Sequence, residues 1–207
     1  MPRRALSHTL LCVIPLILLS PIVQSSSIFW RNSQNGQTWR YVFDNSGWRS
    51  QYINTVPSAW QAFLGDLNGD DQQDIVWRNR ETGVNWGYLM NGAIITQSQQ
   101  INQASTEWNL MGLADLNNDD KDDMIWRNTD GRVWVYLMDG ITINHSHRLA
   151  TVSDDQWKIV GLGDFNGDGH HDLLWRHMLS GATYIYQLQN GYFQQGLALN
   201  VVGPDWN

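Results

Sequence analysis

Three short loops gather most of the acidic side chains of this sequence. They read DLNGDDQQD at 66–74, DLNNDDKDD at 115–123 and DFNGDGHHD at 164–172, and each fits the pattern D-x-N-x-D-[GD]-x-x-D. The loops contain 4, 5 and 3 Asp residues, which together are 12 of the 20 acidic residues. Carboxylates this close together repel one another unless something neutralises them. The spacing therefore indicates a cation site in each loop.

Calcium is the cation that this donor pattern suits best. Oxygen side chains at positions 1, 3 and 5 point inward when such a loop curls, position 7 adds a backbone carbonyl, and the Asp at position 9 offers two oxygens. Calcium takes about six to eight oxygen ligands, whereas magnesium demands a tighter octahedron and keeps its waters. No Cys and no regularly placed His supports zinc. The alternative is a solvated acidic turn, because Asp, Asn and Gly are also ordinary turn formers.

Position 6 of the loops is the sharp turn, where glycine is expected. The third loop has Gly169 there, but the first two have Asp71 and Asp120. Asp tolerates a left-handed backbone better than most residues. We therefore expect the first two loops to form, and to bind calcium less tightly than the third.

Other side chains offer weaker signals. An arginine follows a tryptophan at Arg31, Arg78, Arg127 and Arg176. We expect these arginines to pair with a neighbouring Asp or to stack on a Trp, with an anionic ligand as the alternative. His145 and His147 are two residues apart, which is a minimal metal pair without a third ligand, so solvated histidines are expected. The two Glu residues are isolated and no nucleophile lies in a recognisable motif with a base, so we expect no enzyme activity.

The 12 Trp residues suggest sugar stacking or core packing. Most recur at two fixed positions of a repeat, and recurrence of this kind favours packing between repeated sheets. Trp48 occurs in the first repeat alone and is the better candidate for a surface contact. The recurring residues are Trp30, Trp77, Trp126 and Trp175, and then Trp60, Trp108, Trp157 and Trp206.

The loops belong to a unit that occurs four times. The Trp-Arg pairs lie 47, 49 and 49 residues apart, and a second Trp follows each pair after 30 or 31 residues. Each unit reads as four short strands, with a glycine-ended turn after the first and a tight hairpin turn, such as Asn91-Gly92, after the second. Repeats of about 40 to 50 residues with four antiparallel strands are typical of β-propeller blades. The sequence therefore predicts an all-β, β-propeller-type array of about four partial blades rather than a β-sandwich.

The segment LGDFNGDG at 162–169, followed by DLLWR at 172–176, resembles the FG-GAP or VCBS repeat, the calcium-loop blade also found in the integrin α-chain propeller and in a fungal propeller lectin. The resemblance covers residues 28 to 207. It implies a propeller, usually of seven blades, with calcium between the first and second strands of a blade. The ligand positions that it implies are Asp66, Asn68, Asp70, Gln72, Asp74, Asp115, Asn117, Asp119, Lys121, Asp123, Asp164, Asn166, Asp168, His170 and Asp172, with backbone oxygen alone at 72, 121 and 170.

The chain departs from that family in blade number. Its units, at about 28–74, 75–123, 124–172 and 173–207, are too few for seven blades. In the family's register the chain starts with the second strand of a blade at Ile28 and stops two residues into a first strand at Trp206. A truncated sequence, two chains that complete one ring, and an open arc are all compatible with this pattern.

The first residues indicate export. Residues 1–25 have a charged start at Arg3 and Arg4, an apolar stretch of about ten residues and small residues before a possible cut, which is the pattern of a cleaved signal peptide. The stretch is short for a membrane span, which needs about 20 residues. The only Cys, Cys12, lies within it, so the domain over 26–207 would have no disulfide.

The net charge of −7 excludes a nucleic-acid binder that works through a basic field. These features predict a secreted, extracellular, calcium-stabilised module that is not an enzyme and presents a binding or adhesion surface to a glycan or an extracellular protein. The alternative is an accessory region of a larger secreted enzyme whose catalytic domain lies outside this chain.

Overall fold

The computed structural model describes residues 27–44 and 47–203, and in these ranges every regular element is a β-strand. The expected signal peptide and Trp206 lie outside the described residues. No helix in the described part of the chain is long and apolar enough to cross a membrane.

Fifteen strands form four antiparallel sheets, each made from consecutive strands. The first sheet has three strands, β1 (Ser27–Arg31), β2 (Gln37–Asp44) and β3 (Gly47–Thr55). The second has β4 (Trp60–Gly65), β5 (Asp74–Asn79), β6 (Val84–Asn91) and β7 (Ile94–Gln103). The third has β8 (Trp108–Ala114), β9 (Asp123–Asn128), β10 (Arg132–Asp139) and β11 (Thr142–Thr151). The fourth has β12 (Trp157–Gly163), β13 (Asp172–His177), β14 (Thr183–Gln189) and β15 (Tyr192–Ala198).

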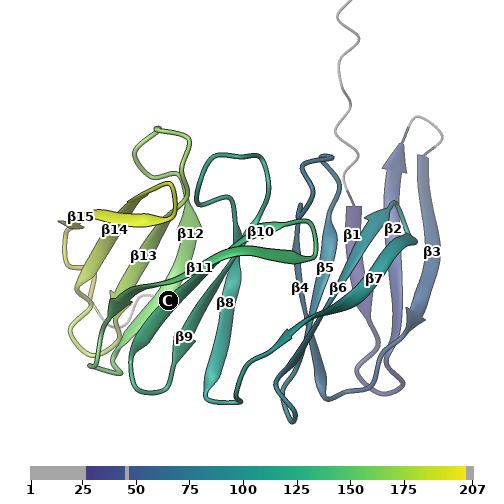
Figure 1. Ribbon diagram of the computed structural model, residues 1–207, viewed down its shortest axis with the longest axis horizontal. Coiled ribbons are helices and arrows are strands. Elements are labelled where there is room, and N and C mark those ends of the chain that lie inside the picture. The colour runs from purple at the N-terminus through teal and green to yellow at the C-terminus, as the bar shows by residue number, and fades with distance from the viewer. Residues whose placement is uncertain (1–26, 45–46, 204–207) are drawn as a thin grey trace, which may run out of the picture.

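The sheets stand side by side in chain order, with the first and the last at the two ends of the row (Figure 1). This is the predicted β-propeller-type array, with three complete blades and one of three strands. Each complete blade starts at the second Trp of one sequence unit and continues with the Trp-Arg strand of the next unit, as the antiparallel pairing of β4 with β5 shows. The first sheet has no strand equivalent to β4 among the described residues.

The core lies between successive sheets. Phe29 and Ile53 of the first sheet pack against Ile75 and Trp77 of the second. The same contact recurs between the second and third sheets, where Val76 lies in one cluster with Trp126, and between the third and fourth. We call the side of a sheet that carries the Trp of the Trp-Arg pair its backward face, because it packs on the preceding sheet, and the opposite side its forward face. Trp77, Trp126 and Trp175 are only 1% exposed, which confirms that these three are core residues.

The turns show why the repeat needs glycine. Gly36, Gly83, Gly131 and Gly181 end the turn after the Trp-Arg strand with positive φ, and a Cβ at Gly83 would lie 1.9 Å from the carbonyl oxygen of Ala104. The hairpin turns differ from the expected Asn-Gly type in two blades. Asn91 pairs with Ile94 and Asp139 with Thr142, so the two-residue loops are Gly-Ala and Gly-Ile, with positive φ at the glycine alone. Only Asn190 and Gly191 both have positive φ.

Candidate functional site

The acidic loops lie between the first and second strands of the three complete blades. The Asp at position 1 organises each loop by accepting hydrogen bonds from its backbone. In the first loop Asp66 Oδ1 accepts the N–H groups of Gly69 and Asp70 at 2.8 and 3.2 Å, and Oδ2 accepts that of Asp71 at 2.6 Å. Asp115 and Asp164 make the equivalent bonds in the other loops. In the third loop these bonds, that from Gly169 first, hold the pKa of Asp164 below its usual value.

The loops share a left-handed turn at position 6. Asp71, Asp120 and Gly169 have φ values of 62°, 64° and 88°. The two aspartates therefore adopt the conformation that the sequence pattern required of them, and the three loops have one backbone shape. At position 3, the side-chain amides of Asn68, Asn117 and Asn166 each donate to the Asp at position 5, at 3.1, 3.0 and 2.8 Å.

The Asp at position 9 is fully buried and joins two strands of its blade. Asp74 Oδ2 accepts the N–H of Leu67 at 2.9 Å, and Oδ1 accepts the N–H of Met90, at the end of β6, at 2.7 Å. Asp123 and Asp172 occupy equivalent places. Burial raises the pKa of Asp74 to about 6 and that of Asp123 to about 7, and the neighbouring loop carboxylates add to both increases. Burial therefore disfavours the charged form of both carboxylates, although each accepts two backbone hydrogen bonds.

The oxygen atoms available in the loops decide whether the loops can bind calcium. Each contains the oxygen donors that calcium prefers, and Asn117 Oδ1 is a buried acceptor with no hydrogen-bond partner. In the described part of the chain no three His, Cys, Asp or Glu side chains form a ligand group, and the carboxylates at positions 1 and 9 accept backbone N–H bonds. Carboxylate oxygens have further lone pairs. The chemistry of the loops therefore fits a calcium ion, and the fit is best supported in the second loop.

Two of the three side chains at position 7 make contacts outside the loop, as expected if only their backbone oxygen serves a cation. Gln72 Oε1 accepts the N–H of Gly92 at 2.8 Å, and Lys121 forms an ion pair of 2.5 Å with Asp139. Both contacts join the loop to the β-hairpin turn of its own blade.

Position 8 links one loop to the loop before it, which the sequence did not reveal. Asp122 Oδ2 accepts the N–H of Asp66 at 2.9 Å, and the N–H of Asp122 donates to the Asp66 carbonyl at 2.6 Å. His171 donates its backbone N–H to the Asp115 carbonyl at 3.0 Å. Position 8 is Gln73, Asp122 or His171, so no recurring residue type marked it. Burial raises the pKa of Asp122.

The four arginines of the Trp-Arg pairs donate hydrogen bonds to backbone carbonyls. In the part of the chain that the structure describes, Arg31, Arg78 and Arg127 form no ion pair with an aspartate. Arg78 donates to the carbonyls of Gly83, Ser105 and Trp108, each at 2.8 Å. Three of the four also stack on the Trp of the following sheet, as expected from the sequence, with Arg78 4.9 Å from the centre of the Trp126 ring. The other two pairs are Arg31 with Trp77 and Arg127 with Trp175.

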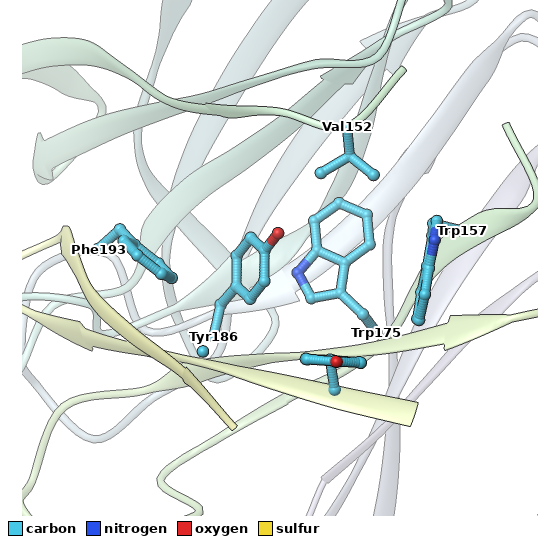
Figure 2. Close-up of a pocket in the computed structure, with 7 residues that line it drawn as sticks. Val152, Trp157, Trp175, Tyr186 and Phe193 are labelled. Carbon is cyan, nitrogen blue, oxygen red and sulfur yellow. The ribbon is translucent and has the colours of Figure 1, made fainter. Parts of the chain in front are cut away.

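Aromatic pockets lie beside the loops that connect the blades. The larger, of about 400 Å³, is lined by Val152 of the connecting loop and by aromatic residues on the backward face of the fourth sheet (Figure 2). They are Trp157, Trp175, Tyr184, Tyr186 and Phe193, with Gly196 on β15. Tyr184 and Phe193 are exposed, and Trp157 meets Tyr184 edge to face at 5.6 Å. A smaller pocket of about 170 Å³ has the equivalent residues Val56, Trp60, Trp77, Trp86 and Tyr88. The second recurring Trp is thus half-buried and lines pockets, where the sequence indicated core.

His145 and His147 form an aromatic stack instead of a solvated pair. Their rings lie 5.6 Å apart, and the His147 ring stacks on Tyr192 of the fourth sheet at 4.1 Å. His147 Nε2 contacts the Gly191 carbonyl at 2.9 Å, and its Nδ1 is buried without a partner. Burial lowers the pKa of His147. The pair therefore joins two blades.

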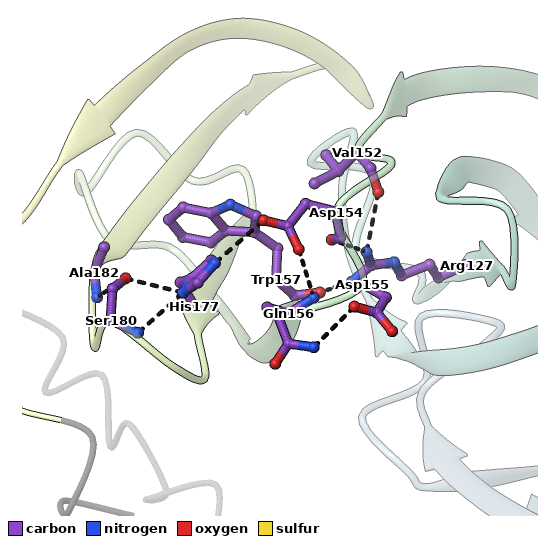
Figure 3. Close-up of polar contacts among 9 residues, drawn as sticks. All are labelled: Arg127, Val152, Asp154, Asp155, Gln156, Trp157, His177, Ser180 and Ala182. Carbon is purple, nitrogen blue, oxygen red and sulfur yellow. Dashed lines mark hydrogen bonds and ion pairs between the residues drawn. The ribbon is translucent and has the colours of Figure 1, made fainter.

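One cluster resembles the Ser-His-Asp arrangement of hydrolases. His177 Nδ1 is 2.9 Å from Ser180 Oγ, and His177 Nε2 is 3.2 Å from Asp154 Oδ2 (Figure 3). The Ser180 backbone N–H also donates to Nδ1, at 3.0 Å. Asn79 occupies the same place after its Trp-Arg pair, and its Oδ1 caps the same turn at 2.9 Å from the N–H of Thr82. The contact of His177 with Ser180 thus repeats a structural turn, and the sequence had given no sign of the pair with Asp154.

The comparison with known protein families finds a match, and it lies in the region of the acidic loops. The model of the FG-GAP-like repeat matches residues 115–175, from the second acidic loop to Trp175. This region is therefore similar to an FG-GAP-like repeat. The matched residues include the second and third acidic loops, and the first acidic loop at 66–74 has the same spacing. No curated protein matches the chain.

The chain is also similar to two solved structures. The Tc holotoxin pore of Photorhabdus luminescens is 14% identical, with 84% of this chain and 11% of that chain covered and a TM-score of 0.43. The WD40 domain of SCAP from fission yeast is 12% identical, with 88% and 45% covered and a TM-score of 0.41. This chain spans less than half the length of either structure.

Proposed function

We propose that this protein is a secreted, non-enzymatic module that binds a glycan in an aromatic pocket between blades and is stabilised by calcium in its acidic loops. The observation that carries the proposal is the pocket of about 400 Å³ that is lined by Trp157, Tyr184 and Phe193 among other aromatic residues. Aromatic faces stack on the apolar faces of sugar rings, and a concave site with a few polar groups is the usual form of a small-ligand site. The two tyrosine hydroxyl groups of the pocket are hydrogen-bonding groups for sugar hydroxyls.

Calcium supports the pocket from outside. The acidic loops connect the first two strands of each complete blade. Burial, and to a smaller extent the neighbouring carboxylates, raise the pKa of Asp74 and Asp123, and a divalent ion bound in the loop would favour the charged form of both. The ion would be held by the oxygen set of each loop, and its part would be structural. Asn117 Oδ1 supports this assignment because it is a buried acceptor that lacks a partner.

A glycan array in calcium buffer tests the binding function. We expect binding to a limited set of glycans, and a loss of at least about tenfold in affinity for Tyr184→Ala and Phe193→Ala, since each removes one stacking face from an exposed position. Trp48→Ala is the matched control, because Trp48 is an exposed aromatic residue outside the pocket. Loss of binding in the Trp48 variant alone would move the site away from the pocket. No binding above background would favour a protein partner.

A further inference from the structure

One contact recurs at every junction between sheets. An arginine on the forward face of one sheet stacks on the Trp of the next, at 5.6, 4.9 and 5.1 Å for Arg31, Arg78 and Arg127. The same guanidinium donates to carbonyls of the loop that leads to that next sheet, as Arg31 does to Val56 and Trp60 at 2.9 and 2.7 Å. The junctions are therefore copies of one interface, which the chain forms three times.

The backward face of the first sheet has no sheet on it in the described structure. Trp30 is 57% exposed, whereas Trp77 in the equivalent place is 1% exposed, and Ile28 is also exposed where Ile75 is buried. Strand pairing places Trp39 opposite Trp30 and Tyr41 opposite Ile28, so all four side chains share this face. Tyr52, opposite Trp39, extends the face onto β3. All five side chains are exposed.

The forward face of the fourth sheet is open in the same way. Phe165, at position 2 of its acidic loop, is 44% exposed, whereas Leu67 and Leu116 at that position are completely buried within the core clusters between sheets. Val160 is 49% exposed, while Met111 in the equivalent place packs against the cluster shared with the next sheet. Arg176 already makes the loop contacts of its equivalents, with donation to the carbonyls of Val202 and Gly203 at 3.2 and 2.8 Å.

We propose that the forward face of the fourth sheet docks on the backward face of the first sheet of a second copy of this chain, with Arg176 stacked on Trp30. The two faces carry the two halves of the interface that the chain already forms at each internal junction, which is why a second copy is the occupant favoured. The contact joins different surfaces, so association is head-to-tail and leads to a ring or an open chain of copies. Burial of the two exposed apolar faces also drives this association.

Light scattering and sedimentation velocity of the purified chain test this. We expect a mass at least twice that of one chain, which falls on dilution. Trp30→Ala and Arg176→Ala should each give the mass of one chain, because every junction needs both faces. A mixture of the two variants should recover a dimer and nothing larger, since the intact first sheet of the Arg176 variant meets the intact fourth sheet of the Trp30 variant.

Controls separate loss of association from loss of fold. Arg80→Ala and Ile94→Ser change exposed residues away from both faces and should keep the wild-type mass. If Trp30→Ala or Arg176→Ala melts at a lower temperature than wild type, the test is repeated with Ile28→Glu and Val160→Glu. Each of these variants puts a charge on an exposed position of one face. A wild-type chain that stays monomeric at all concentrations, or variants whose mixture does not recover a dimer, would overturn the proposal.

Discussion

Arginine is the residue on which the junctions between sheets depend most. The loop between two blades has carbonyls that no strand pairs, and a guanidinium with five donors satisfies several of them at once. Arg78 donates to four carbonyls and is almost completely buried, although burial lowers its pKa. A lysine would offer one compact ammonium group in place of the planar guanidinium with its several donors. The stacked Trp on the next sheet completes the contact.

Removal of the Arg78 side chain is therefore expected to be costly. Arg78→Ala leaves buried carbonyls without donors and removes the stacking on Trp126, so the free energy of unfolding should fall by about 3 kcal/mol. Arg80→Ala is the control, because Arg80 is exposed, and a change within about 0.5 kcal/mol is expected. Urea unfolding measures both. Equal losses in the two variants would contradict the role given to Arg78.

The exposed carboxylate at position 5 of an acidic loop is expected to contribute to stability mainly when calcium is present. Asp168 is exposed and lies at position 5 of the third loop. Asp168→Ala should lower the melting temperature in calcium by an amount that corresponds to about 1.4 to 2.7 kcal/mol, and should change it little in chelator. Asp155→Ala, an exposed aspartate outside the loops, should behave alike in both buffers. Equal losses for Asp168→Ala in both buffers would refute the metal role of that loop.

At the scale of elements, the strands and turns that recur in each repeat could be predicted from the sequence. The contacts that one blade makes with its neighbour could not. The Trp-Arg strands, the glycine turns and the left-handed Asp71 and Asp120 follow from local spacing and backbone preference. The link from Asp122 to Asp66 does not, because position 8 has a different residue in each loop and its partner is on another blade. The exposed Trp30 also escaped prediction, since its burial depends on a preceding sheet and not on its own strand.

The stack of His147 on Tyr192 makes one junction sensitive to acid. Burial holds the pKa of His147 below its unfolded value of 6.5, and Nδ1 has no acceptor for a second proton. Below pH 6.5 the unfolded chain therefore binds a proton that the folded chain resists, so stability falls as pH falls through that value. His147→Phe keeps a stacking ring but does not titrate.

The expected result is a smaller loss of melting temperature between pH 7.5 and 5 for His147→Phe than for wild type. Thermal scans at both pH values measure it in one buffer series. The comparison is between the two slopes, because the sequence contains other histidines that are the same in both proteins. Identical slopes for the two proteins would show that this histidine contributes nothing to acid sensitivity.

At the scale of the whole molecule, the free energy of unfolding is expected to be approximately the sum of the contributions of the blades and of the junctions between them. Each complete blade buries its backward face on the sheet before it, and the second and third acidic loops each contact the acidic loop before them. Three loops that bind calcium would therefore act on successive parts of one array. The aromatic pocket lies on the backward face of the fourth sheet, so an array that opens at that junction would also lose the pocket.

The most direct test is the melting temperature of the purified chain from Ser26 onward, first in 10 mM calcium and then in excess chelator. If each site has a dissociation constant of ~0.1 to 1 mM, calcium adds ~1.4 to 2.7 kcal/mol per site. Over three sites we predict a rise of roughly 10 °C or more. A cooperative unfolding transition at the same melting temperature in both buffers would contradict the calcium-binding role of the loops. The acidic loops would then be turns that need no cation.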